Sequence, residues 1–224
     1  MIQIEGEKQS NLVRQKLSQL VAKGHKTYTP TQLVVDGAEG IWLRNVEGVK
    51  LMDFASGVLV SNLGHQHPYF EQQLAKYAHD LPRNAYNLLT KVEVEAASRL
   101  IDSFNLSHME RVLWAACGSA GIIKAMWAAQ NYHPDRHIIL ATRHGFHGKK
   151  GLAGDVTGNQ SKNPNVRWID FPMVKDIRDQ PASDLMKQQV LAQLTGLQKE
   201  YPDQISMLVT EPYLGAKGSY HPLD

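Results

Sequence analysis

The sequence predicts an α/β protein in which helices cover both faces of a mostly parallel sheet. In the second half of the chain, short and uniformly apolar runs alternate with longer segments of helical periodicity. Strands that are apolar on both faces are typical of parallel sheets buried between helices. Residues 1–60 differ, because one helical segment precedes short apolar runs that are broken by turn residues. This part predicts a small N-terminal α+β segment.

The N-terminal segment begins with a predicted amphipathic helix. Residues 33–57 follow with short apolar runs that are broken at Asp36-Gly37 and at residues 45–48, which predicts an antiparallel meander. Four apolar residues recur at helical spacing and define the face of the helix that we expect to be buried: Val13, Leu17, Leu20 and Val21.

After the meander the pattern changes to alternating helices and strands. The change places a predicted boundary near residue 60 and two domains at residues 1–60 and 61–224, the first as part of a small domain. Thr90 and Glu93 form a capping box at the start of one helix. The other predicted elements are helices at 69–79, 120–131 and 182–200 and strands at 111–115, 137–141, 166–169 and 205–209.

Composition limits the classes of partner and of compartment. The 224 residues are 42% hydrophobic and 21% charged, as in an ordinary globular protein. The net charge is +2 and basic residues are scattered, so we expect neither nucleic acid nor a membrane surface as a partner. The N-terminus is polar and no apolar run is long enough to cross a bilayer. Cys117 is the only cysteine, which excludes an internal disulfide and favours the cytoplasm.

Small residues at 115–119 separate an apolar run from a helical segment. The first N–H groups of a helix have no partner within it, and the helix dipole adds partial positive charge there. Gly118 allows close approach of an anion, and Ser119 can act as N-cap or donate its hydroxyl. This loop predicts a phosphate cradle. The alternative is a tight turn whose small residues only let helix and strand pack closely.

The next strand-to-helix junction, RHGFHGKKG at residues 143–151, places an aromatic residue between glycines. Phe146 could lie flat on a planar cofactor, and His147 could donate a hydrogen bond beside it. Elsewhere two patterns predict less chemistry. His65 and His67 have no acidic or cysteine cluster around them, so we expect no metal site. Cys117 lies among alanines, which predicts a buried and inert thiol.

Four motifs occur in order along the chain. A Gly-rich meander leads to Gly-His-x-His-Pro at residues 64–68, and ACGSAG, FHG and VTEPYLGAKG follow at 116–121, 146–148 and 209–218. In this order and at these intervals they resemble the N-terminal half of the class III aminotransferases. These are fold-type-I enzymes that use pyridoxal 5'-phosphate and include ornithine, 4-aminobutyrate and ω-amino-acid transaminases.

The resemblance implies roles for individual residues. Gly118 and Ser119 would offer main-chain N–H groups to the cofactor phosphate. Phe146 would stack on the pyridine ring with His147 beside it, and Glu211 would lie near the ring. The resemblance also places two residues in the substrate pocket, Leu59 and Val60.

The resemblance further implies amino transfer between a primary amine or ω-amino acid and a keto acid, carried out by a homodimer. Ala216 replaces the second glutamate that ornithine- and 4-aminobutyrate-type enzymes carry. The family's Schiff-base lysine and its aspartate for the pyridine nitrogen correspond to positions beyond residue 224. We therefore assign no catalytic residue in this chain and interpret it as truncated. The alternatives are another fold-type-I enzyme such as an aminomutase, a non-enzymatic module that binds a phosphate ligand, or an inactive half-chain that acts as a scaffold or needs a second polypeptide.

Overall fold

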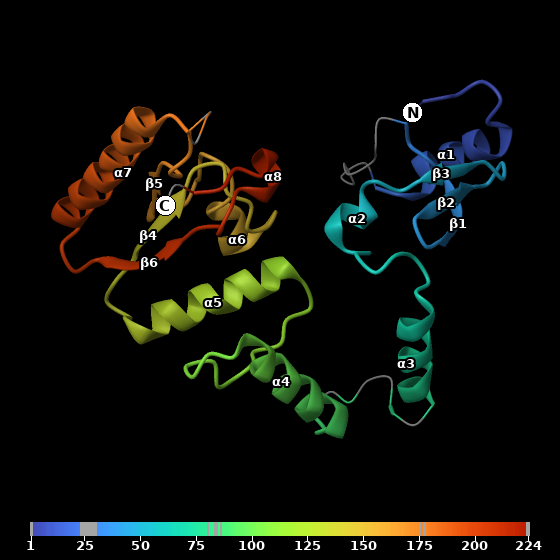
Figure 1. Cartoon of the computed structure of the whole chain (residues 1–224), viewed down its shortest axis with the longest axis horizontal. Coiled ribbons are helices and arrows are strands. Elements are labelled where there is room, and N and C mark those ends of the chain that lie inside the picture. The colour runs from blue at the N-terminus through green and yellow to red at the C-terminus, as the bar shows by residue number, and fades with distance from the viewer. Residues whose placement is uncertain are drawn as a thin grey trace. The chain divides into compact units, whose positions relative to one another are not determined.

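The structure is a computed structural model and describes residues 2–22, 31–79, 81–82, 85, 87–174, 176 and 178–222. The chain forms two compact units, Met1–Lys91 and Val92–Asp224, which are described separately (Figure 1). Within the described residues, no helix is long and apolar enough to cross a membrane. Because these units are defined by packing alone, the assignment of residues 1–60 to a small domain stays a prediction.

The first unit is built around a three-stranded antiparallel sheet with strand order β1-β2-β3, which confirms the meander. The predicted turn at residues 45–48 is present: Gly48 N–H donates to the Asn45 carbonyl at 2.9 Å. Asp36-Gly37 instead lies within β1, at an irregularity of the strand register. The elements of the unit are α1 (Lys8–Leu20), β1 (Val35–Glu39), β2 (Trp42–Asn45), β3 (Lys50–Met52), α2 (Ser56–Leu59) and α3 (Pro68–Ala78).

Helix α1 forms where predicted but buries polar residues. Ser10 donates its backbone N–H and its hydroxyl to the two carboxylate oxygens of Glu47, at 2.7 and 2.6 Å. Arg14 is buried and pairs with Glu7 at 2.5 Å. Most of the expected apolar face is exposed instead: Val13, Leu20 and Val21 are exposed, and only Leu17 is half-buried. The prediction of the buried face was therefore wrong for most of its residues, because the buried side chains of α1 are Ser10 and Arg14.

The second unit contains a parallel sheet with strand order β5-β4-β6. Helices α5 and α6 lie on one face of this sheet and α7 lies on the other (Figure 1). These helices and strands confirm the predicted alternation. The elements are α4 (Lys91–Phe104), α5 (Gly118–Tyr132), β4 (Ile138–Thr142), α6 (Gly151–Asp155), β5 (Val166–Ile169), α7 (Gln180–Glu200), β6 (Ile205–Val209) and α8 (Gly215–Gly218).

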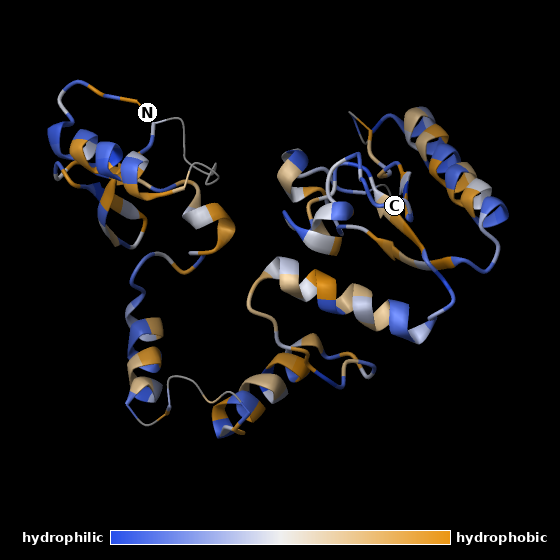
Figure 2. Ribbon diagram, turned by 180° about the vertical axis from the view of Figure 1, so that it is seen from behind, coloured by the Kyte–Doolittle hydropathy of each residue, from blue (hydrophilic) through white to orange (hydrophobic). Residues whose placement is uncertain are grey.

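The core of this unit lies between β4 and α5. All five residues of β4 are buried, as expected for a central parallel strand. Alternate residues Ile139 and Ala141 pack against Met126 of α5. Figure 2 shows helix α5 as mostly orange to pale, with blue at its hydrophilic positions. On the opposite face, Arg167 of β5 donates to the Tyr201 hydroxyl at 2.7 Å, just after α7.

The strand predicted at residues 111–115 is not formed. Leu113 and Trp114 are exposed, and the Trp114 carbonyl accepts a hydrogen bond from the Lys124 ammonium. A strand needs a partner for its backbone groups, and the described residues offer none at this position. Local apolar composition alone was therefore insufficient to predict a strand.

Candidate functional site

The carboxyl ends of β4 and β6 bring two predicted motifs together. The two strands are parallel neighbours, and the hydroxyls of Thr142 and Thr210 are hydrogen-bonded at 3.1 Å where the strands end. One residue further on, the Glu211 carboxylate accepts the backbone N–H of Phe146 at 3.0 Å. The loop after β4 is thus joined to the loop after β6 at the edge of the sheet where ligands of α/β proteins bind.

The first turn of α5 has free backbone donors. Cys117 precedes the helix in an extended conformation, and its carbonyl accepts from Gly121 N–H at 3.0 Å. Among the described residues, none accepts from the N–H groups of Gly118, Ser119 or Ala120. A Cβ added to Gly118 would meet no atom within 4 Å, so neighbouring side chains do not crowd this glycine. This geometry suits an anion.

Two details of this turn differ from the prediction. The N-cap is Cys117 and not Ser119, which is the second residue of the helix. Cys117 is exposed and not buried. The helix starts at Gly118, two residues earlier than the pattern predicted, which makes Cys117 the N-cap. Cys117 is exposed together with residues 113–116, which form no strand.

The α5 turn and the loop after β4 lie in contact. Gly148 is buried and has φ +149°, and a Cβ at this position would come within 2.9 Å of both Ser119 Cβ and Ala153 Cβ. Real Cβ atoms do not approach so closely, so only glycine fits here. Ser119 and the Phe146–Gly148 segment therefore belong to one cluster, which we call the edge site: Gly118, Ser119, Phe146, His147, Gly148 and Glu211.

The two ring side chains of the edge site differ in exposure. Phe146 keeps 47% of its surface exposed, whereas His147 keeps only 6%. Burial lowers the pKa of His147, and the nearby Glu211 carboxylate opposes this shift. The imidazole is therefore neutral at neutral pH, and its Nε2 atom has no hydrogen-bond partner among the described residues.

One member of the surroundings was missed by the sequence analysis. The Thr157 hydroxyl lies just after α6 and accepts the N–H groups of His147 and Gly148 at 2.9 and 3.2 Å. No motif marks this residue, because its role depends on the return of the chain from α6 to the loop. The Arg143–Asp170 ion pair at 3.0 Å, between the ends of β4 and β5, was also not predicted.

The predicted substrate residues belong to the first unit. Leu59 and Val60 are exposed, and Val58 and Leu59 have left-handed φ values of 63° and 64°. Such values are strained for non-glycine residues. The role of Leu59 and Val60 in substrate contact stays a prediction. In the same unit, His65 of the Gly-His-x-His-Pro motif donates to the Asp53 carboxylate at 2.7 Å.

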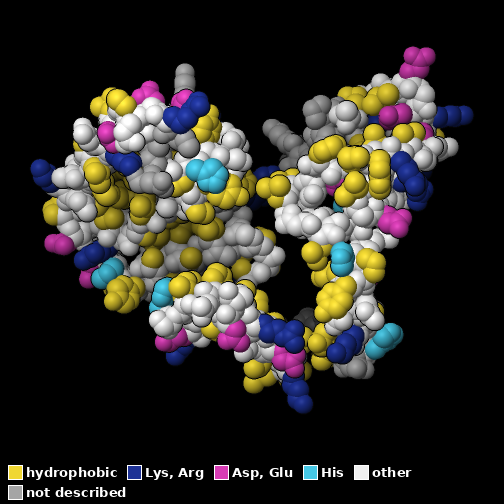
Figure 3. Space-filling model, in the orientation of Figure 1, with side chains coloured by type: hydrophobic (Ala, Val, Ile, Leu, Met, Phe, Trp, Pro, Cys, Tyr) yellow, Lys and Arg dark blue, Asp and Glu magenta, His cyan; other side chains and the backbone are white. Residues whose placement is uncertain are grey.

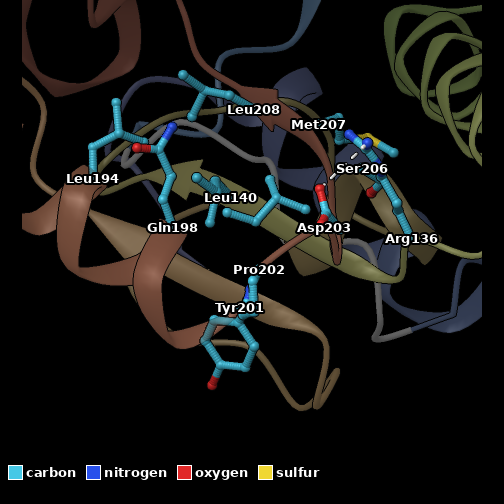
Figure 4. Close-up of a pocket in the computed structure, with 11 residues that line it drawn as sticks. Arg136, Leu140, Leu194, Gln198, Tyr201, Pro202, Asp203, Ser206, Met207 and Leu208 are labelled. Carbon is cyan, nitrogen blue, oxygen red and sulfur yellow. Dashed lines mark ion pairs between the residues drawn. The ribbon is translucent and has the colours of Figure 1, made fainter.

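A separate cavity of about 570 Å³ lies on the α7 face of the sheet (Figure 4). Leu194, Leu140 and Leu208 line one part of it, and the Arg136–Asp203 ion pair, at 4.0 Å, lies at another. None of the residues that line it belongs to the edge site. Most of the polar side chains that line it already have partners within the fold: Arg136 pairs with Asp203, Ser206 donates to the Ile138 carbonyl and Tyr201 accepts from Arg167. We therefore take the edge site as the candidate functional site.

Comparison with known proteins identifies the family of this chain. The family model described as Aminotransferase class-III matches residues 23–224. The chain belongs to the class III aminotransferases. This membership confirms the resemblance carried by the four motifs.

Relatives in this family include acetylornithine aminotransferases and a gamma-aminobutyrate transaminase. Acetylornithine aminotransferase from Brucella melitensis is 30% identical over 158 residues, which cover 65% of this chain and 38% of that protein. The Vibrio cholerae acetylornithine aminotransferase is 28% identical and the mitochondrial gamma-aminobutyrate transaminase 1 of Oryza sativa subsp. indica 24%, with 87% and 85% of this chain and 46% and 40% of those proteins covered. The chain thus spans less than half the length of these curated relatives.

Solved structures show the same fold. An amine transaminase from an uncultivated Pseudomonas species, solved in its PLP-bound form, superposes with a TM-score of 0.77 at 22% identity, covering 90% of this chain and 50% of that one. An (S)-enantioselective omega-transaminase from Thermomicrobium roseum gives 0.77 at 21% identity, with 96% and 52% covered. The fold is therefore fold type I, of which this chain provides about half.

Proposed function

We propose that the edge site holds pyridoxal 5'-phosphate in an aminotransferase that moves an amino group between a primary amine or ω-amino acid and a keto acid. The observation that carries this proposal is the contact between the α5 turn, with its free N–H groups, and the loop that bears Phe146. Together they offer an anion site and an exposed aromatic ring in one cluster. A phosphate ester of a planar ring would match this site, because its phosphate would accept from the N–H groups and its ring would stack on Phe146.

The residues present fit the cofactor. The N–H groups of Gly118 and Ser119 would bind its phosphate, and the Phe146 ring would stack on the pyridine ring. His147 would lie beside the ring, as the family resemblance implies, and its backbone N–H is held by the Thr157 hydroxyl. When bound, the cofactor supplies an electron-accepting ring that stabilises negative charge on the substrate carbon. The described residues bind and orient, and none is assigned to move a proton.

We further propose a homodimer and a cytoplasmic location. Many apolar side chains of the second unit are exposed, and hydrophobic side chains are visible on the face drawn in Figure 3. Exposed apolar patches of this kind mark protein interfaces. The exposed residues of the segment that runs from α4 to α5 include Val94, Leu100, Phe104, Leu106, Met109, Leu113 and Trp114. For the location, the absence of a second cysteine fits a reducing compartment.

Binding of pyridoxamine 5'-phosphate to the 224-residue chain tests the cofactor assignment, because this form needs no lysine. We expect saturable binding in calorimetric titration. Gly118→Asp adds negative charge where a Cβ meets no other atom, so it should lower affinity by tenfold or more, since about 1.4 kcal/mol is tenfold. Gly196→Asp on α7 is the matched control, because its Cβ also meets nothing within 4 Å.

The ring contact is tested separately. Phe146→Ala should weaken binding of pyridoxamine 5'-phosphate by roughly 2- to 13-fold, as expected for the loss of about 0.5–1.5 kcal/mol of stacking. Affinity that is the same in the wild-type chain, Gly118→Asp and Phe146→Ala would contradict the assignment of both motifs to the cofactor.

A further inference from the structure

The part of the loop at residues 146–148 is held by side chains and not by backbone acceptors. The N–H groups of Phe146, His147 and Gly148 are consecutive, and none of them donates to a backbone carbonyl among the described residues. They donate instead to two side chains, with Phe146 on the Glu211 carboxylate and the other two on the Thr157 hydroxyl. The backbone of residues 146–148 therefore depends on two side-chain acceptors that come from different loops.

The Thr157 hydroxyl is fully used in this arrangement. It accepts from His147 and Gly148 and donates its own proton to the Ala153 carbonyl of α6 at 2.9 Å. A hydroxyl has one donor and two acceptor positions, so no capacity remains for another partner. The loop is thereby tied to the last turn of α6, which is itself fixed in the core through Ala153 and Val156.

The neighbouring backbone reinforces this connection. Gly158 N–H donates to the Gly145 carbonyl at 2.9 Å, and His144 N–H donates to the Gly158 carbonyl at 2.8 Å. The segment after α6 therefore lies antiparallel to the start of the loop. It sets residues 144–145, and the Thr157 hydroxyl extends the same restraint to the part of the loop that carries the two rings.

We propose that Thr157 is a positioning residue, which acts through the backbone of His147 and Gly148 to hold the Phe146 and His147 rings in the orientation that receives the cofactor. The inference rests on the proposed function for the identity of the ligand, but not for the restraint itself. Glu211 accepts the N–H of Phe146, and Thr157 accepts the N–H groups of the two residues that follow it. The pair of acceptors preorganises the edge site before the ligand arrives.

The first test measures the restraint without any ligand. Thr157→Val keeps the shape of the side chain and removes the acceptor, whereas Thr157→Ser keeps the hydroxyl. In the intact chain, backbone hydrogen exchange at His147 and Gly148 should become about tenfold faster or more in Thr157→Val, and Thr157→Ser should restore it. Thr195→Val, at an exposed position of α7, is the matched control and should leave exchange unchanged.

The second test measures positioning. Pyridoxamine 5'-phosphate should bind Thr157→Val about tenfold more weakly than the wild-type chain, while the affinity for inorganic phosphate should change less than about twofold, because the α5 turn is intact. Unchanged exchange at residues 147–148, or unchanged affinity for pyridoxamine 5'-phosphate, would overturn the proposal. Faster exchange throughout β4 as well would also overturn it, since Thr157 would then be a general structural residue. Absence of binding by the wild-type chain would reject the proposed function, and the exchange measurement would still decide the restraint.

Discussion

At the scale of single residues, Gly148 is where the two halves of the edge site meet. Its buried backbone lies against Ser119 and Ala153, and its φ is +149°. We expect Gly148→Ala to lower the free energy of unfolding of the second unit by about 2 kcal/mol or more, because the new methyl group forces these elements apart. Urea denaturation followed by circular dichroism measures this change.

The control for this substitution is another glycine. Gly196 lies inside α7 with open space around its Cα, so Gly196→Ala should raise stability by roughly 0.5–1 kcal/mol through its higher helix propensity. Similar effects of the two substitutions would contradict the close packing of Gly148 against the α5 turn.

His147 makes the stability of the second unit depend on pH. Its pKa is lowered below the ordinary value of 6.5, mainly by burial, and Glu211 only partly opposes this. Below pH 6.5 the unfolded chain therefore binds a proton that the folded imidazole does not. We expect stability to fall as the pH decreases from 6.5 towards the folded pKa.

The measurement compares urea midpoints at about pH 7.5 and about pH 5.5. His147→Gln should reduce the difference between the two midpoints, whereas His137→Gln, at an exposed position just before β4, should preserve it. An equal pH dependence in all three proteins would show that another group is responsible.

The residues of the edge site differ in how far the sequence could reveal them. Gly118 and Phe146 stand in short motifs with unusual composition, and their local chemistry is enough to suggest a phosphate and a ring. Thr157 stands in an ordinary segment. Its importance arises only because the chain turns back after α6, and a single sequence carries no pattern that specifies this contact.

At the scale of secondary structure, the parallel strands were predictable because burial on both faces leaves an uninterrupted apolar run, as in β4. The segment at 111–115 has a similar composition but no partner strand, so it forms none. The prediction of the buried face of helix α1 fails for another reason, because its contacts with Glu47 and Glu7 cannot be read from hydrophobic periodicity. The hydrophobic pattern of the sequence thus predicts where an element lies better than it predicts what the element contacts.

The N-terminus of α7 has a side-chain cap. The Asp179 carboxylate accepts the Ala182 N–H at 3.1 Å. Asp179→Ala should lower the free energy of unfolding by about 1 kcal/mol, because one helix donor loses its partner. Asp184→Ala, which removes only an exposed side-chain contact with Gln180, should cost less than about 0.5 kcal/mol. Equal losses in thermal or urea denaturation would contradict a role for the cap.

Docking of α1 should depend on the ionised Glu47. Hydrogen bonds from the side chain and backbone of Ser10 lower the pKa of Glu47 below its ordinary value of 4.5. The contact is therefore fully present above pH 4.5 and is lost as the pH falls through the folded pKa. Glu47→Ala should accelerate hydrogen exchange in residues 8–20 at neutral pH, whereas Glu39→Ala on β1 should not. Unchanged exchange in Glu47→Ala would show that α1 is held by other contacts.

At the scale of the whole molecule, the exposed apolar residues of the segment that runs from α4 to α5 are a feature that packing within the second unit leaves unexplained. Val94 and Leu113 each keep 67% of their surface exposed. If the proposed homodimer uses this surface, the chain should sediment at twice its mass of 25.1 kDa at high concentration. Val94→Asp and Leu113→Asp should each weaken association by roughly tenfold or more, since a buried unpaired charge is costly at an interface. Leu191→Asp on α7 replaces an equally apolar side chain outside this segment and serves as the control. Analytical ultracentrifugation over a concentration series distinguishes the cases: a monomer at every concentration, or equal weakening by all three substitutions, would contradict a dimer formed by the segment from α4 to α5.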